Sequence, residues 1–253
     1  MDILLTNDDG IRAVGLRALY SALTAAGHRV FVAAPMTEQS AVGHAVTLFS
    51  PLRVKEVTEQ HFAGLGVSGT PADCVKLALS HLLTHKPDMI VSGINSGANV
   101  GVDVLYSGTV SAATEGALAG VTALAVSVDD YHPTDLSAQA QYVARFIELD
   151  LWADFPRQSV LNLNFPSCPL PETKGITVCR QTRATYRDWY DERKDPRGNP
   201  YYWLGGDIPS ENVSPDSDRA LLSQGYITVT PLTFDLTHTA YLDVLRAHLS
   251  SAD

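Results

Sequence analysis

The chain has 253 residues, of which 45% are hydrophobic and 18% are charged, the composition of an ordinary globular protein with one substantial core. The formal net charge of −10 argues against duplex nucleic acid as a partner, because neutralising backbone phosphates requires a basic surface. No apolar run reaches the length of about 18 residues that a membrane span needs, so we expect no membrane partner.

The N-terminus and the cysteines predict a cytoplasmic protein. The chain begins Met-Asp-Ile-Leu-Leu, which lacks the basic segment and cleavage site of a signal peptide and is typical of a first β-strand. Cys74, Cys168 and Cys179 are odd in number, widely spaced and outside any CxxC pattern. We therefore expect buried thiols in a reducing compartment, with neither a disulfide framework nor a thiolate zinc site.

Strand and helix signals alternate from the first residues onward. A short apolar strand at 3–6 is followed by the turn Asn-Asp-Asp-Gly at 7–10. Leu16, Leu19, Tyr20 and Leu23 then recur on one face of a helix, which Gly27 would end. The next strand, at 30–34, is stopped by Pro35.

A second helix begins near Thr70, which suits the N-cap position, with Pro71 at the first helical position and Asp73 placed for a capping box. This helix is predicted to run to about residue 84. The alternation then continues with a strand at 88–92, a glycine-rich loop, a helix at 110–119, a strand at 123–128, a helix at 136–149 and a strand at 160–164.

Apolar strands separated by amphipathic helices predict a parallel sheet that is covered on both faces. The sequence therefore predicts a Rossmann-like three-layer α/β/α core with a mostly parallel sheet over residues 1–165. A C-terminal extension at 166–253 follows. Its segment 182–215 has little periodicity and is expected to be an irregular loop that serves the site or a subunit contact. Beyond it we expect a helix at 218–224, a strand at 226–230 and a helix at 242–249.

Polar side chains follow three of the predicted strands. Because ligands bind beyond the carboxyl ends of the strands in an open parallel sheet, these side chains should converge at one sheet edge. The groups are Asn7, Asp8 and Asp9 after the first strand, Glu38, Gln39, Ser40 and His44 after the second, and Asn95, Ser96 and Asn99 after the third.

Asp8 and Asp9 form the centre of this predicted site. Two adjacent carboxylates repel each other unless one is protonated or a cation lies between them. With only oxygen ligands available, the cation should be a hard one, Mg²⁺ or Mn²⁺, with Ca²⁺ as an alternative. The simpler interpretation is that one aspartate caps the following helix and the other faces water.

A phosphate site is predicted at Ser107, Gly108 and Thr109, which precede a helix of small residues. A helix N-terminus offers free N–H groups and the positive end of the helix dipole, although simple N-capping would explain the same residues. Asn95 and Asn99 stand among glycines that let the backbone approach a ligand closely. His44 could contact substrate or be an ordinary surface group.

The ordered set of motifs resembles the SurE family of stationary-phase survival proteins, which are phosphatases of nucleoside 5′- and 3′-monophosphates. The resemblance covers nearly the whole chain. It rests on LLTNDDG at 4–10, AP…EQSAVGHAVT at 34–47, GTPADCV at 69–75, SGINSGANVG at 92–101, YSGTVSAATEG at 106–116, ALAVS at 123–127 and GYITVTPL at 225–232.

The resemblance implies a metal-dependent phosphomonoesterase of the 5′-nucleotidase class acting on nucleoside 5′-monophosphates. Whether 3′-monophosphates and short polyphosphate are further substrates is left open by the sequence. One divalent cation per subunit would be held by Asp8, Asp9, Ser40 and Asn95. Asn99 and the turn at 107–109 would hold the phosphate. The resemblance also implies a homodimer or homotetramer in which C-terminal segments are exchanged.

The expected mechanism is metal-assisted hydrolysis, in which Asp8 or Asp9 orients a water or accepts its proton; a covalent aspartyl-phosphate is the alternative route. Two other classes of protein begin similarly. A haloacid-dehalogenase-type phosphatase needs its aspartates two positions apart, and a receiver-like signalling module needs an acceptor aspartate where Asn95 stands. A dinucleotide-binding protein would need a G-x-G-x-x-G or a similar motif, which the sequence lacks.

Overall fold

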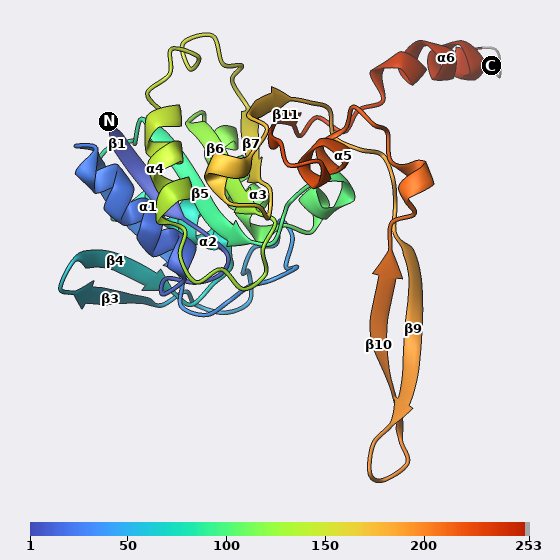
Figure 1. Cartoon of the computed structure of the whole chain (residues 1–253), viewed down its shortest axis with the longest axis horizontal. Helices are drawn as coiled ribbons and strands as arrows, with labels where there is room; N and C mark the ends of the chain where they lie inside the picture. Colours follow the sequence, from blue (N-terminus) through green and yellow to red (C-terminus); the bar gives the residue numbers. More distant parts are fainter. Residues whose placement is uncertain (251–253) are drawn as a thin grey trace.

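The computed structural model describes residues 1–250, and its centre is one nine-stranded sheet (Figure 1). The strand order is β3-β4-β2-β1-β5-β6-β7-β11-β8. The six strands from β4 to β7 run parallel, while β3 pairs antiparallel with β4 and β11 pairs antiparallel with β7 and parallel with β8. The predicted mostly parallel α/β/α fold is thus confirmed.

The strands of this sheet are β1 (Asp2–Thr6), β2 (Arg29–Pro35), β3 (Val54–Glu59), β4 (Phe62–Val67), β5 (Met89–Ser96), β6 (Thr122–Val128), β7 (Ser159–Phe165), β8 (Ile176–Val178) and β11 (Ile227–Thr233). The helices are α1 (Val14–Ala25), α2 (Pro71–Leu77), α3 (Gly108–Leu118), α4 (Ser137–Phe146), α5 (Asp218–Ser223) and α6 (Thr239–Ser250). Strands β9 (Arg187–Lys194) and β10 (Pro200–Asp207) form a separate two-stranded hairpin.

Alternate residues of the parallel strands pack against different helix layers, because successive side chains of a strand point to opposite faces. Ile3 and Leu5 belong to the cluster that includes the apolar face of α1 and α4, whereas Leu4 and Ile90 pack with α2 and α3. All four side chains are buried. Since both faces are covered, the strands have continuous apolar sequences rather than alternating ones.

Two features of the sheet differ from the sequence-based expectation. Strand β5 continues to Ser96, so Asn95 lies on a strand rather than in a loop, because its last residues pair with the end of β6 after a register shift. Strands β3 and β4 were not predicted. Five of the six residues of β3 are exposed, which leaves no apolar alternation to mark it.

The segment 182–215 is not an irregular loop throughout, because β9 and β10 pair antiparallel along their full length. This hairpin stands away from the body of the molecule, as does α6 at the end of the described chain (Figure 1). Neither element has a buried residue. The boundary near residue 165 stays a prediction, since β8 and β11 lie beyond it and extend the same sheet.

Within residues 1–250, no helix combines the length and the apolar character needed to cross a membrane.

Candidate functional site

The turn after β1 is locked by Asn7, whose side chain is fully buried. Its amide nitrogen donates to the carbonyl of Gly10 at 2.9 Å, and its amide oxygen accepts from the N–H of Gly10 at 3.2 Å. Gly10 has a φ of +99°, and a Cβ there would lie 3.3 Å from the backbone of Thr37. Glycine therefore allows this turn to approach the loop after β2, and the turn fixes Asp8 and Asp9 at the sheet edge.

Asp8 is buried and points at the N-terminus of α3. The N–H of Thr109 donates to its Oδ2 at 3.1 Å, and the Thr109 hydroxyl donates to its Oδ1. Burial raises the pKa of Asp8 to about 6; the hydrogen bonds from Thr109 oppose this shift, and the neighbouring Asp9 adds to it. The carboxylate form is therefore incompletely compensated by the protein.

Asp9 reaches the carboxyl end of β5. Its Oδ2 accepts the N–H of Ser96 at 3.0 Å. Burial raises the pKa of Asp9, Ser96 partly offsets the shift, and the negative charge of Glu38 adds to it. The Asp9 carboxylate is only half-buried, so a cation or a water can reach it.

The first turn of α3 packs directly on Asp8. Ser107 is the N-cap, and its hydroxyl accepts the N–H of Val110 at 3.1 Å. A Cβ on Gly108 would lie 2.7 Å from the Cβ of Asp8, so only glycine fits there. Thr109 donates to Asp8, as described above. The simple capping role therefore applies to Ser107, while Gly108 and Thr109 bring the positive end of the helix dipole to the acidic pair.

The loop after β2 approaches the same point. The N–H of Gln39 donates to the carbonyl of Asp8 at 2.8 Å. The neighbouring Ser40 is exposed, and its hydroxyl donates to Glu38 Oε1 at 2.5 Å. The structure therefore brings the 38–40 segment to Asp8 and Asp9, with the Ser40 hydroxyl turned towards Glu38.

Asn95 and Asn99 lie in different surroundings. The amide nitrogen of Asn95 donates to the carbonyl of Gly97 at 2.6 Å, and its Oδ1 accepts no hydrogen bond from the described chain. Asn99 is buried, and its amide nitrogen donates to the hydroxyl of Ser127 at 2.8 Å, while its backbone is bonded to Asn164. Asn95 thus directly precedes Ser96, whose N–H binds Asp9, whereas the Asn99 side chain is anchored towards β6.

His44 has a different hydrogen-bond partner from the rest of the predicted set. Its Nε2 lies 2.8 Å from Glu115 Oε1, and Lys76 Nζ donates to Glu115 Oε2 at 3.2 Å. No hydrogen bond joins it to Asp8 or Asp9 in the described part of the chain. A contact between His44 and substrate stays a prediction.

The arrangement fits a hard divalent cation. Within residues 1–250, no group of three or more His, Cys, Asp or Glu side chains could hold a metal, so a soft or all-carboxylate site is not built here. Asp8, Asp9 and the free amide oxygen of Asn95 instead offer a smaller set of hard oxygen ligands. Burial raises the pKa of both aspartates, so a cation bound there would stabilise their charged forms.

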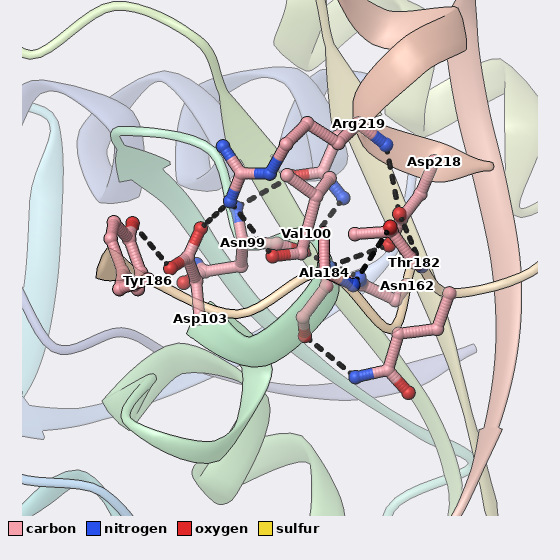
Figure 2. Close-up of polar contacts among 12 residues, drawn as sticks. Asn99, Val100, Asp103, Asn162, Thr182, Ala184, Tyr186, Asp218 and Arg219 are labelled. Carbon is pink, nitrogen blue, oxygen red and sulfur yellow. Dashed lines mark hydrogen bonds and ion pairs between the residues drawn. The ribbon is translucent and has the colours of Figure 1, made fainter. Parts of the chain in front are cut away.

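A further polar network, which the sequence did not predict, ties the loop after β5 to the C-terminal extension (Figure 2). The buried carboxylate of Asp218 accepts the N–H groups of Gly101 and Thr182, each at 2.8 Å. Asp103 accepts from the Tyr186 hydroxyl at 2.7 Å and from the Arg219 guanidinium. No local sequence motif predicts this network, because hydrogen-bonded residues such as Val100 and Arg219 lie as far as 119 positions apart in the sequence.

Comparison with known proteins gives a consistent result. The family model described as "Survival protein SurE" matches residues 3–188. The chain is 62% identical over 249 residues to the 5′-nucleotidase SurE of Solidesulfovibrio magneticus, with 98% of each chain covered. It is 49% identical to the 5′-nucleotidase SurE of Syntrophobacter fumaroxidans, covering 97% of this chain and 98% of that one. The crystal structure of the SurE protein from Aquifex aeolicus superposes with a TM-score of 0.84 at 34% identity, covering 98% of this chain and 99% of that chain.

Proposed function

The chain belongs to the SurE family, and from this premise we propose that it is a metal-dependent phosphomonoesterase that hydrolyses nucleoside 5′-monophosphates to nucleoside and phosphate. The relatives named above are 5′-nucleotidases at high identity over the full chain. The single structural observation that carries the proposal is the adjacent pair of buried Asp8, which binds the first turn of α3, and half-buried Asp9, which binds the end of β5. Activity on 3′-monophosphates or short polyphosphate would use the same site.

Asp8, Asp9, Ser40 and Asn95 are proposed to hold the cation, which we expect to be Mg²⁺ or Mn²⁺, one per subunit, with Ca²⁺ as the alternative. When bound, such an ion polarises a phosphoryl oxygen and lowers the pKa of a bound water. Ser40 needs only to turn its hydroxyl away from Glu38, since both groups lie in an exposed loop.

The aspartates are proposed to act on the attacking water, and the first turn of α3 is proposed to bind the phosphate. A water oxygen bonds to phosphorus as the ester P–O bond breaks, and the nucleoside oxygen leaves as a hydroxyl after taking up a proton. The half-buried carboxylate of Asp9 is suited to orient that water or accept its proton. Gly108 carries an N–H group that bonds to no other described residue, at the positive end of the helix. With Thr109, it supports a phosphate site that offsets charge on the transferring group. Direct attack by an aspartate is the alternative route.

The two rival functions lack support. A haloacid-dehalogenase-type phosphatase would need aspartates two positions apart, whereas Asp8 and Asp9 are adjacent and bind different elements. A receiver-like module would need an aspartate near the end of the strand beside β1, where β5 carries Asn95. Neither class is the family that the chain matches.

We propose that the protein acts in the cytoplasm as a homodimer or homotetramer. The support lies in the two elements that stand away from the body. The β9–β10 hairpin exposes Trp189, Tyr190, Tyr202, Trp203 and Leu204. An isolated two-stranded hairpin is marginally stable in water, so this segment is expected to be completed by a second subunit.

The experiment that tests the function is phosphate release from a panel of nucleoside 5′- and 3′-monophosphates, with Mg²⁺, Mn²⁺ or a chelator. We expect turnover with a cation and its loss after thorough chelation, restored by adding the ion back. Phosphate release that persists at full rate in chelator would contradict the metal site. Transfer of phosphate from a small donor to the protein, without nucleotide hydrolysis, would favour the receiver-like alternative.

A further inference from the structure

We propose that Tyr131 forms the surface on which the nucleobase of the substrate stacks. The inference rests on the proposed nucleotidase function and names a part of the site that acts on the nucleoside rather than on the phosphate. Tyr131 lies in the loop that follows β6, at the same carboxyl edge of the sheet as Asp8 and Asp9.

The ring of Tyr131 is supported from one side by the backbone next to Asn95. An ideal Cβ built on Gly97 would meet ring atoms of Tyr131 at 2.9, 3.2 and 3.6 Å, so the ring lies directly on this glycine. The carbonyl of Gly97 accepts from Asn95, and its N–H donates to Val128, the last residue of β6. The support is therefore a part of the sheet edge and not a free loop.

The rest of the Tyr131 side chain faces outward, since the residue is 73% exposed. A large aromatic ring held against backbone on one side and open to solvent on the other is suited to stacking with a flat base, because every nucleobase presents a π-face. Asn95, which is proposed to hold the cation, is thereby joined through Gly97 to an aromatic surface. A nucleotide whose phosphate lies at Asp8 and Gly108 would extend its base towards this ring.

Two other exposed tyrosines are less suited to this role. The hydroxyl of Tyr186 is bound to Asp103 and joins it to the network with Arg219. Burial, the hydrogen bond to Asp103 and the charge of Asp103 raise the pKa of Tyr186 to about 12, with a smaller contribution from nearby Tyr131. Tyr106 precedes the N-cap of α3, and its carbonyl accepts from Gly43 in the loop after β2. Tyr131 instead packs on Gly97, which directly follows β5 and whose carbonyl accepts from Asn95.

The test compares adenosine 5′-monophosphate with ribose 5-phosphate, which carries the same phosphate ester without a base. The measured quantity is the ratio of kcat/KM for the two substrates. Tyr131→Ala is expected to lower this ratio by about tenfold or more, mainly through KM, because base–aromatic stacking is lost. Tyr131→Phe retains the ring and is expected to keep the ratio within about twofold. Leu149→Ala, which removes an exposed side chain in the segment after α4, is the control.

The outcomes separate the inference from the proposed function. If the wild type hydrolyses neither substrate, the function itself is wrong. If the wild type prefers the nucleotide and Tyr131→Ala retains that preference, the stacking role is overturned while the function stands. If Tyr106→Ala lowers the kcat/KM ratio and Tyr131→Ala does not, the stacking role of Tyr131 is also overturned. The base would then be assigned to Tyr106.

Discussion

At the residue scale, the carboxyl groups of buried Asp8 and half-buried Asp9 are removed from water more than their hydrogen bonds compensate. Thr109 and Ser96 supply hydrogen bonds, yet burial keeps the pKa of both aspartates raised. A site of this kind favours either a proton or a cation. Function and stability are therefore expected to respond differently to the removal of one of these charges.

Replacing Asp8 or Asp9 with asparagine is expected to lower kcat by at least about 100-fold, because a cation ligand and a proton acceptor are lost. The fold should remain intact, since asparagine has nearly the same shape. In cation-free buffer the thermal midpoint should stay equal or rise, because two adjacent carboxylates no longer repel each other. Phosphate release and thermal unfolding measure the two effects, with Asp150→Asn, an exposed substitution, as the control.

Cation binding should weaken in acid, because a proton and the cation compete for Asp8. With the pKa of Asp8 raised to about 6 in the cation-free protein, its carboxyl group takes up a proton as the pH falls through that value. Mn²⁺ affinity, measured by calorimetry, is then expected to fall by about tenfold per pH unit below about pH 6. The Asp8→Asn variant should bind weakly and with a shallower dependence on pH. Equal wild-type affinities at about pH 5 and about pH 7.5 would be inconsistent with this competition.

At the element scale, Asp73 joins helix α2 to the loop after β2. It forms the predicted capping box with Thr70, whose hydroxyl accepts the N–H of Asp73 at 3.1 Å. Its carboxylate also accepts from the backbone N–H of Thr47 at 3.0 Å and from the Thr47 hydroxyl at 2.6 Å. Burial by itself would raise the pKa of Asp73, but the bonds from Thr47 and Thr70 outweigh it and hold the pKa below 3.8.

Asp73→Ala is expected to lower the free energy of unfolding at neutral pH by about 1–3 kcal/mol, since a cap and several charge-assisted hydrogen bonds are lost. The unfolded chain binds a proton at Asp73 more readily than the folded one, so this stabilisation is present above about pH 4 and is lost as the pH falls through the lowered folded pKa. In urea unfolding, the difference in free energy of unfolding between the wild type and Asp73→Ala should therefore become smaller as the pH falls. The control Asp150→Ala should change the free energy of unfolding by no more than about 0.5 kcal/mol at neutral or at acid pH.

The predictability of these elements from sequence follows from their burial. The strands of the parallel core have continuous apolar sequences, and α2 carries its cap in its sequence, so their existence could be predicted. Strand β3 and the β9–β10 hairpin are exposed, so neither had the apolar alternation that marks a strand packed on a core. The acidic pair at 8–9 was recognisable by adjacency. The network around Asp218 was not, because only the folded chain brings Gly101 and Thr182 to it.

At the scale of the whole molecule, the exposed β9–β10 hairpin is expected to decide the oligomeric state. The indole of Trp189 lies across Gly205, where an added Cβ would be 2.6 Å from its Nε1, so the ring is held in place on the hairpin. Trp189 is still 52% exposed and Trp203 60% exposed. Tryptophans fixed on a projecting element are typical of subunit contacts.

Light scattering is therefore expected to give the mass of a dimer or tetramer for the wild type and a smaller mass for the double variant Trp189→Ser with Trp203→Ser. Leu149→Ser removes an apolar side chain that is 52% exposed in the segment after α4, and it should leave the mass unchanged. A wild type that is monomeric at micromolar concentration, or a double variant of unchanged mass, would contradict the assignment of this hairpin to the interface.

The hydrogen bond between Gly101 and Asp218 also affects the order in which parts of the protein can fold during synthesis. The two residues are 117 positions apart, and Asp218 follows every strand of the parallel core. When the ribosome has synthesised the chain as far as β7, Asp8, Asp9 and α3 are present. Asp218, whose carboxylate anchors the loop after β5, has not yet been synthesised. We expect a nascent chain to build most of its sheet before that loop is fixed. A chain truncated ahead of residue 218 would thus carry the acidic pair together with an untethered loop after β5.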